Sequence, residues 1–238
     1  MRYLSLCSGI EAASVAWSPL GWTPVAFAEV DPFCCKLLAH RFPGIPNLGD
    51  ITAPDFVDRA LALGPIDLVV GGTPCQAFSV AGLRRGLADD RSNLALRFVE
   101  IVHGINPAWA LWENVPGALT IEDNAFGCLL GGLLGSDTAV DPGRFGWTDA
   151  GMALGPARDA CWRTLDAQHF GLAQRRRRLF VASRRARDGA GGAAVLLEPE
   201  GVRRHLAPSR EEGKGAPAST PATADDGVAR CLTTRGGG

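Results

Sequence analysis

The first 183 residues alternate between short apolar runs and segments with helical patterning, and this rhythm constrains the fold more than any other feature. The predicted strands are 3–7, 25–29, 66–70, 108–112, 161–169 and 179–183, and the predicted helices are 11–17, 32–42, 93–103 and 123–134. The last two strands are expected to form a hairpin around Gly171. Such alternation is typical of an α/β fold with helices on both faces of the sheet. We therefore expect a mostly parallel, doubly wound sheet with an antiparallel C-terminal strand.

The composition changes after this region. Residues 188–238 are dominated by Gly, Ala, Pro, Arg, Glu and Thr, which indicates a largely irregular segment, either a linker or the start of an incomplete further region. One folded domain is therefore expected over 1–187. The hydrophobic content of 46% is ample for its core. No apolar run approaches the roughly 18 residues that cross a bilayer, and the N-terminus has no signal-peptide pattern. We expect a cytoplasmic location without membrane contact.

The cysteine spacing argues against a metal site, and the charge distribution indicates a positive surface. The seven cysteines form no CxxC pair and no zinc-like spacing with histidine, so no metal site is expected. The formal net charge is −1, yet residues 174–187 (QRRRRLFVASRRAR) hold seven arginines and no acid. This distribution predicts one strongly positive edge on an almost neutral molecule.

Polar and glycine-rich residues follow the predicted strands where each strand ends. Ligands of such sheets bind beyond the carboxyl ends of the strands, at the point where strand order reverses. We therefore expect these residues to share one site. They are the Ser8, Gly9 and Ile10 loop, Glu29, Asp50, Cys75 and Glu113.

The stretch GGTPCQAFS, residues 71–79, presents Cys75 in a loop rich in turn-forming residues. A thiol in such a loop is a candidate nucleophile. The histidines lie in unrelated contexts, which argues against a papain-like protease. A cysteine without a histidine suits an electrophile that is activated elsewhere, for example a ring protonated by the carboxyl group of Glu113.

Three motifs together resemble the DNA (cytosine-5)-methyltransferases of phages and bacteria. They are GGTPCQAFS, ENV at 113–115 and QRRRR at 174–178, and they occur in the family's order over about residues 1–183. The resemblance implies a Rossmann-like methyltransferase fold, S-adenosylmethionine as cofactor and double-stranded DNA as partner. The target cytosine would have to leave the duplex, because neither a thiol nor a methyl donor reaches it there.

The resemblance also implies a role for each matching residue. Cys75 would add to carbon 6 of the flipped cytosine, so that carbon 5 takes the methyl group. Glu113 would hold ring nitrogen 3, and Arg178 would contact oxygen 2. Arg176 would support the active-site loop. The positions expected to contact DNA are Gln76, Ser79, Arg84, Arg85 and Gln174, with 82–92 as a lid over the base.

For the cofactor, the resemblance implies that Ser8, Gly9 and Ile10 wrap the methionine part and the ribose. Glu29, with Val30 beside it, would bind the ribose hydroxyls. The adenine would be held by Asp50 and Ile51, and Pro74 would also line the cofactor site. Two positions depart from the family, which commonly continues Gly-Ile-Gly-Gly where this chain has Gly9, Ile10, Glu11 and Ala12. We expect the first helix to approach the cofactor less closely for that reason.

By comparison with the family, we expect the C-terminal part to lack most of a target-recognition region and of the closing motifs. We expect a monomer that is catalytically incomplete alone, or a subunit that needs a complementing C-terminal chain. Two alternatives stay open at this point: a noncatalytic subunit that binds cofactor or DNA, and an RNA cytosine methyltransferase of the related tRNA-acting type. Restriction-modification is one biological setting that fits the resemblance.

Overall fold

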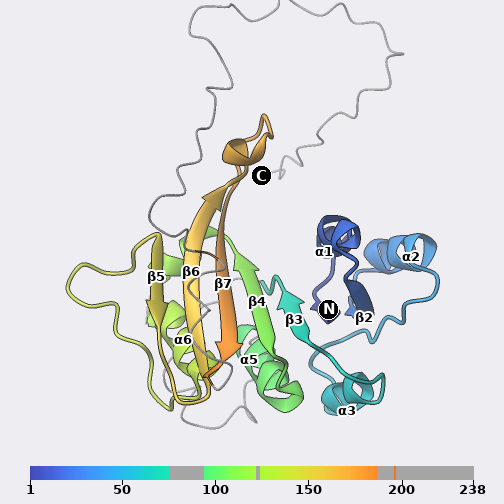
Figure 1. Ribbon diagram of the computed structural model, residues 1–238, viewed down its shortest axis with the longest axis horizontal. Coiled ribbons are helices and arrows are strands. Elements are labelled where there is room, and N and C mark those ends of the chain that lie inside the picture. Colours follow the sequence, from blue (N-terminus) through green and yellow to red (C-terminus); the bar gives the residue numbers. More distant parts are fainter. Residues whose placement is uncertain (75–93, 122–123, 187–195, 197–238) are drawn as a thin grey trace, which may run out of the picture. The chain divides into compact units, whose positions relative to one another are not determined.

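The computed structural model describes residues 1–74, 94–121, 124–186 and 196 of the chain (Figure 1). The chain divides into two units, Met1–Arg203 and Arg204–Gly238, and all described residues belong to the first. The predicted nucleophile and the following loop, and the 188–238 segment apart from Leu196, lie outside the described residues.

All six predicted strands and all four predicted helices are present, with bounds shifted by a few residues. The strands are β1 (Arg2–Leu6), β2 (Thr23–Ala28), β3 (Leu68–Gly71), β4 (Trp109–Asn114), β5 (Ala150–Ala153), β6 (Arg158–Asp166) and β7 (Arg177–Arg185). The helices are α1 (Ala12–Trp17), α2 (Pro32–Arg41), α3 (Phe56–Leu61), α5 (Leu94–Ile105) and α6 (Ala125–Leu134). Short 3-10 turns are η1 (Ser18–Leu20), η2 (Pro116–Thr120) and η4 (Ala167–Phe170).

The strands form one sheet in the order β2-β1-β3-β4-β7-β6-β5. Strands β1 to β4 pair in parallel, and β7 runs antiparallel to both β4 and β6. The predicted mostly parallel sheet with an antiparallel C-terminal strand is thereby confirmed. From β1 the chain moves outward to β2 and then returns to β3 on the other side of β1, so strand order reverses between β1 and β3. The carboxyl ends of the parallel strands flank this reversal, which is where such sheets bind ligands.

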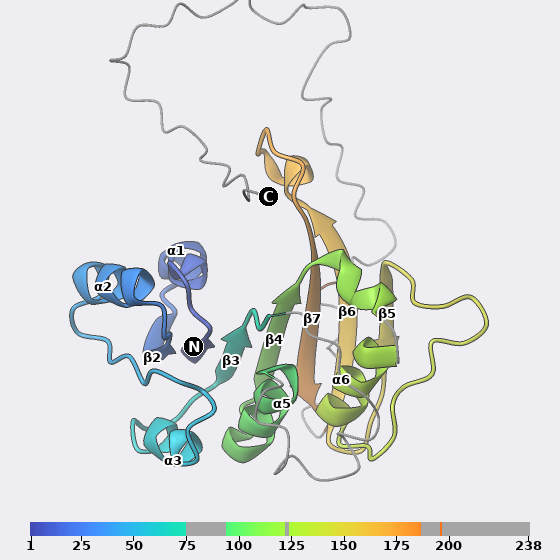
Figure 2. The same ribbon diagram turned by 180° about the vertical axis from the view of Figure 1, so that it is seen from behind.

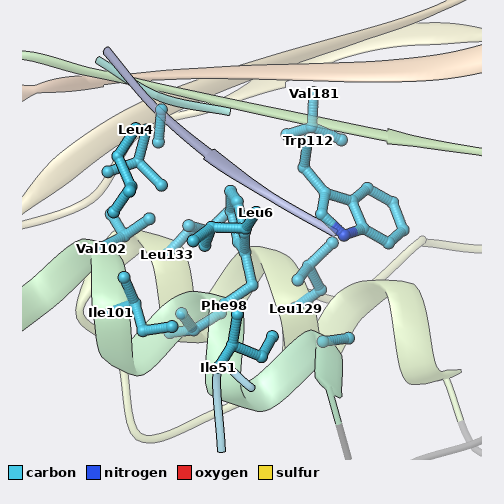
Figure 3. Close-up of a cluster of buried hydrophobic side chains, with 14 of the residues drawn as sticks. Leu4, Leu6, Ile51, Phe98, Ile101, Val102, Trp112, Leu129, Leu133 and Val181 are labelled. Carbon is cyan, nitrogen blue, oxygen red and sulfur yellow. The ribbon is translucent and has the colours of Figure 1, made fainter. Parts of the chain in front are cut away.

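One face of the sheet packs on α5 and α6, and the opposite face of β1 packs on α1. Leu4 and Leu6 of β1 point toward α5 and α6 (Figure 3). The ring of Tyr3, which points the other way, meets the ring of Trp17 in α1 edge-to-face at 5.1 Å. Helices therefore cover both faces, as predicted. Each large apolar side chain buried this way contributes roughly 1.5–3 kcal/mol of transfer free energy.

The structure departs from the sequence-based expectation in three places. Helix α3 and strand β5 were not predicted, and the expected strand 161–169 ends at Asp166. The strand stops there because the Asp166 carboxylate accepts a hydrogen bond from the amide of Gln168 and caps η4. The hairpin of β6 and β7 carries η4 at its tip, beyond the end of β4 (Figures 1 and 2). None of the helices in the described ranges is long and apolar enough to span a membrane.

Candidate active site

Glu113, at the end of β4, forms an ion pair with Arg178 of β7. The distance from Nε of Arg178 to Oε1 of Glu113 is 2.9 Å. The antiparallel pairing explains the contact: Glu113 lies opposite Phe180, so Arg178, two residues before Phe180, stands diagonally across on the same face. Their side chains are 33% and 24% exposed, which leaves both groups accessible to a ligand. The structure thus brings together two of the four predicted catalytic residues.

The backbone of the 71–74 loop passes close to the same carboxylate. A Cβ built on Gly72 would lie 2.9 Å from Oε2 of Glu113, closer than real side chains approach. Glycine at this position is therefore what lets the loop and the carboxylate approach each other. Pro74, the last described residue of this loop, precedes Cys75 directly. Cys75 and the other predicted residues of that segment (Gln76, Ser79, Arg84 and Arg85) lie outside the described residues.

Two buried side chains of β4 donate hydrogen bonds to Thr73. The indole Nε1 of Trp112 donates to Oγ1 of Thr73 at 2.9 Å, and Nδ2 of Asn114 donates to the carbonyl oxygen of Thr73, also at 2.9 Å. All three residues are 5% exposed or less. These contacts fix the start of the loop that leads to Cys75. This role of Trp112 and Thr73 was not predicted from the sequence, because the apolar run around Trp112 and the turn-like run around Thr73 contain no signal for it.

Arg176 and Gln174 lie exposed just before β7. Among the contacts of the described residues, neither side chain takes part in the ion pair of Glu113 and Arg178. The amide of Arg176 donates to Oδ1 of Asp166 at 3.1 Å, which ties the two ends of the hairpin tip together. Arg177 forms an exposed ion pair with Asp149 at 3.0 Å. Exposed pairs of this kind contribute little to stability.

Glu29, which follows β2, ties the first loop to the second strand end. Its Oε2 accepts a hydrogen bond from the amide of Gly9 at 2.7 Å, and its Oε1 accepts from the amides of Val30 and Asp31 at 2.8 Å each. Ser8 links the same two elements, because its hydroxyl donates to the Ser5 carbonyl and accepts from the Ala28 amide. Four of the predicted cofactor residues, Ser8, Gly9, Glu29 and Val30, therefore meet at one edge of the sheet.

The Asp50 loop reaches the same neighbourhood. Burial, followed by the negative charges of Glu29 and Asp50, raises the pKa of the Cys7 thiol to about 11. Both carboxylates therefore act on one partly buried sulfur just after β1. Ile51 is 4% exposed, and its carbonyl oxygen accepts from Nε of Arg97 in α5 at 2.7 Å. Helix α5 thus anchors the loop that carries Asp50.

These residues suit S-adenosylmethionine chemically. The Glu29 and Asp50 carboxylates can accept hydrogen bonds from ribose hydroxyls and an adenine amino group, and they favour a positively charged ligand. Ile10 and Val30 are 56% and 65% exposed, and they offer apolar surface at the same strand ends. Among the described residues, no group of three or more His, Cys, Asp or Glu side chains is arranged to hold a metal ion.

The sheet has three features of the Rossmann-like methyltransferase fold, and together they define it. They are the strand order, the reversal between β1 and β3 where such sheets bind ligands, and the antiparallel strand β7. A solved structure that is similar is a prophage-encoded Escherichia coli protein described as a DNA modification methyltransferase. Its TM-score is 0.56 at 22% identity, over 78% of this chain and 47% of that chain. At such identity the likeness concerns the fold alone.

Sequence comparison gives the family. Residues 1–130 match the family described as C-5 cytosine-specific DNA methylase, and the chain belongs to that family. The Type II methyltransferase M.AquIA of Picosynechococcus sp. is 31% identical over 77% of this chain and 72% of its own length. Family membership implies S-adenosylmethionine as the cofactor.

A relative from Escherichia phage P1 is more similar in sequence and carries a different name. It is called a DNA N-6-adenine-methyltransferase and is 46% identical over 243 residues, which cover 88% of this chain. The chain spans only 32% of the length of that relative. The name of that relative therefore does not fix the target base of this chain.

Proposed function

We propose that this chain carries the catalytic part of a DNA (cytosine-5)-methyltransferase, with Cys75 as the nucleophile. The observation that supports this most is the Glu113 and Arg178 pair, which stands within contact distance of the Gly72 position in the loop that leads to Cys75. A carboxyl group and a guanidinium side by side match the ring nitrogen 3 and oxygen 2 of a cytosine.

In the proposed reaction, the Cys75 thiolate forms a bond to carbon 6, and the displaced electron pair makes carbon 5 nucleophilic. Glu113 supplies a proton at nitrogen 3, and Arg178 donates a hydrogen bond to oxygen 2, so that negative charge does not build up on the ring. Carbon 5 then takes a methyl group, which the cofactor supplies on a positively charged sulfur. Loss of the carbon 5 proton to solvent and cleavage of the bond to Cys75, which regenerates the thiolate, restore the aromatic ring, and the proton at nitrogen 3 returns to Glu113.

The same residues favour cytosine over adenine as the target. An exocyclic amine attacks a sulfonium methyl group with its own lone pair and needs no thiol. A nucleophile is needed only when a ring carbon has to be activated. Since GGTPCQAFS places a cysteine after Pro74 and next to the loop that approaches Glu113, carbon methylation accounts for residues that amine methylation would leave without a function.

On the cofactor side, we assign the methionine loop to Ser8, Gly9 and Ile10, and the ribose to Glu29. Asp50 and Ile51 would bind the adenine, with Val30 and Pro74 beside the cofactor. The contacts that the Glu29 carboxylate makes to the first loop support this assignment. We further propose 1–187 as the catalytic domain and 188–238 as a linker or the start of an incomplete target-recognition region.

Two points support double-stranded DNA as the partner. Exposed arginines lie near the hairpin tip, where they can contact phosphates. The proposed chemistry also needs a base that has been flipped out of a duplex. We assign DNA contacts to Gln76, Ser79, Arg84, Arg85 and Gln174, and a supporting role in the active-site loop to Arg176. A DNA substrate also favours the cytoplasm of a bacterial or phage-infected cell. The relatives are consistent with a restriction-modification setting, since M.AquIA is named a Type II enzyme.

A second candidate is a chain that binds cofactor and DNA but needs a partner chain for turnover. The observation in its favour is length, because the chain spans about a third of the phage P1 relative and 47% of the prophage structure. In that case a complementing C-terminal chain would supply the target recognition.

The test is methyl transfer from tritiated S-adenosylmethionine to duplex DNA of mixed sequence, followed by digestion to nucleosides. We expect label in 5-methylcytosine, and none with Cys75→Ala. Label in N6-methyladenine would contradict the proposed target base, and label that survives Cys75→Ala would contradict the mechanism. A parallel reaction with transfer RNA tests the RNA alternative. Cofactor binding without any transfer would favour the second candidate.

A further inference from the structure

Glu11 is a buried carboxylate beneath the cofactor loop that the proposed reaction does not use. We propose that Glu11 is a positioning residue for the cofactor, because it fixes the backbone of residues 7–11 in the shape that receives the methionine part of S-adenosylmethionine. The inference rests on the cofactor that the family implies and not on the methylated base.

The carboxylate of Glu11 is enclosed and bonded through both oxygens. Glu11 is only 1% exposed to solvent. Oε2 accepts from the hydroxyl of Ser5 at 2.7 Å, and Oε1 accepts from both the amide and the hydroxyl of Ser14 at 3.0 Å each. The hydroxyl groups of Ser14 and Tyr3 are 2.6 Å apart, and Tyr3 is fully buried. Glu11 therefore connects β1 with α1 through a closed polar network.

The loop above this network has an unusual backbone. Cys7, Gly9 and Glu11 all have positive φ values, of 50°, 54° and 63°, within five residues. A side chain in this region costs roughly 1 kcal/mol or more per residue unless its surroundings hold it there. The Glu11 amide also donates to the Ser8 carbonyl at 2.8 Å, which closes the turn. The polar network is the feature that compensates for the left-handed conformation at position 11.

This conformation decides where the Gly9 amide points. The amide donates to Oε2 of Glu29 at 2.7 Å, so Glu29 holds the loop from the ligand side while Glu11 holds it from the sheet side. Burial raises the pKa of the Glu11 carboxyl group, and the hydrogen bonds from Ser5 and Ser14 lower it. A side chain kept in such an environment, where glycine would satisfy the backbone angles at no steric cost, has a function other than filling space.

The expected effect of losing this network is weaker cofactor binding with little change elsewhere. Glu11→Gln keeps the shape but presents an amide NH2 group to donors that need an acceptor. Glu11→Gly suits the positive φ but removes the carboxylate that joins Ser5 and Ser14. We expect each variant to raise the dissociation constant for S-adenosylmethionine, measured by calorimetry, by about tenfold, since a misplaced binding loop commonly costs that much or more.

A second measurement separates positioning from general destabilisation. Hydrogen exchange of the cofactor-free chain should become faster in the peptide that covers residues 4–14, while the α5 and α6 peptides should keep their wild-type rates. The control is Ile101→Val. Ile101 is fully buried in α5, and this substitution should lower the free energy of unfolding by roughly 0.5–1.5 kcal/mol without altering a residue of the 7–11 loop. It should leave the dissociation constant within about twofold of the wild-type value.

Wild-type binding by both Glu11 variants would overturn the proposal. So would weakened binding accompanied by faster exchange throughout the sheet, or an equal loss in the Ile101→Val control. Both readouts are independent of methyl transfer. A failure of the proposed reaction would therefore leave the result interpretable, and a failure of this inference would leave the proposed reaction standing.

Discussion

Replacement of Gly72 by alanine should slow methyl transfer without destabilising the protein. The new Cβ would stand 2.9 Å from Oε2 of Glu113, and an acceptable carbon to oxygen contact is about 3.3 Å or more, so the carboxylate has to retreat by about 0.4 Å. A displacement of about 1 Å at a reacting group can cost about a hundredfold in rate. Scaled to this shift, we expect kcat to fall about tenfold, which corresponds to roughly 1.4 kcal/mol of activation free energy.

Stability should not follow activity in this variant, because the clashing atom is the movable end of a side chain and not backbone. Alanine also reduces the conformational freedom of the unfolded chain, which stabilises by roughly 0.4–1 kcal/mol where the backbone is compatible. The assay compares kcat, or the rate of adduct formation on fluorinated DNA, with the melting temperature. Gly44→Ala is the matched control, since a Cβ there meets no atom within 4 Å. A Gly72→Ala rate within twofold of this control would refute the reasoning.

Three further outcomes are expected. Thr73→Val leaves the buried indole N–H of Trp112 without its acceptor and should lower the free energy of unfolding by about 1–3 kcal/mol in urea titrations, whereas an unchanged value would contradict this. The Cys7 thiol, with its pKa raised from 9.0 to about 11, should be alkylated about a hundredfold more slowly at pH 8 than a thiol at the ordinary value, because its thiolate fraction grows only as the pH approaches 11. A mass-spectrometric pH series checks this, and alkylation at the ordinary rate would contradict it. Gly151→Ala places a Cβ 2.2 Å from Cζ2 of Trp162 and should lower the melting temperature by several degrees, whereas an unchanged value would show that the β5 contact is dispensable.

The alternation of strands and helices was predictable because buried strands and amphipathic helices differ in hydrophobic period. The run 66–70 and the helix pattern at 93–103 correspond to β3 and α5 for that reason. Strand β5 was not predictable, because Ala, Gly, Met and Ala have no strand preference of their own. It forms only because it pairs with β6, and Gly151 lies against Trp162, eleven residues further along the chain.

The site shows the same division. Glu29 and Glu113 were predicted as site residues because acids at strand ends of a parallel sheet lie where such sheets bind ligands. The structure places them at the carboxyl ends of β2 and β4, and their role in binding or catalysis stays a prediction. Glu11 appeared in the sequence only as a departure from a glycine pattern. Its function as an anchor depends on Ser5 and Ser14, whose hydroxyl groups converge only after α1 has packed on β1. Contacts made by packing of this kind have no signature in local sequence.

The central claim, that Cys75 bonds to carbon 6 of a cytosine, is tested most directly by trapping the chain on duplex DNA that contains 5-fluorocytosine in the presence of S-adenosylmethionine. Fluorine at carbon 5 cannot leave as a proton does, so the bond to the enzyme persists and can be located by mass spectrometry after proteolysis. We predict a nucleotide adduct on the peptide that contains Cys75. Methylated unmodified DNA with no adduct in the trapping reaction, or an adduct on another cysteine, would contradict the account.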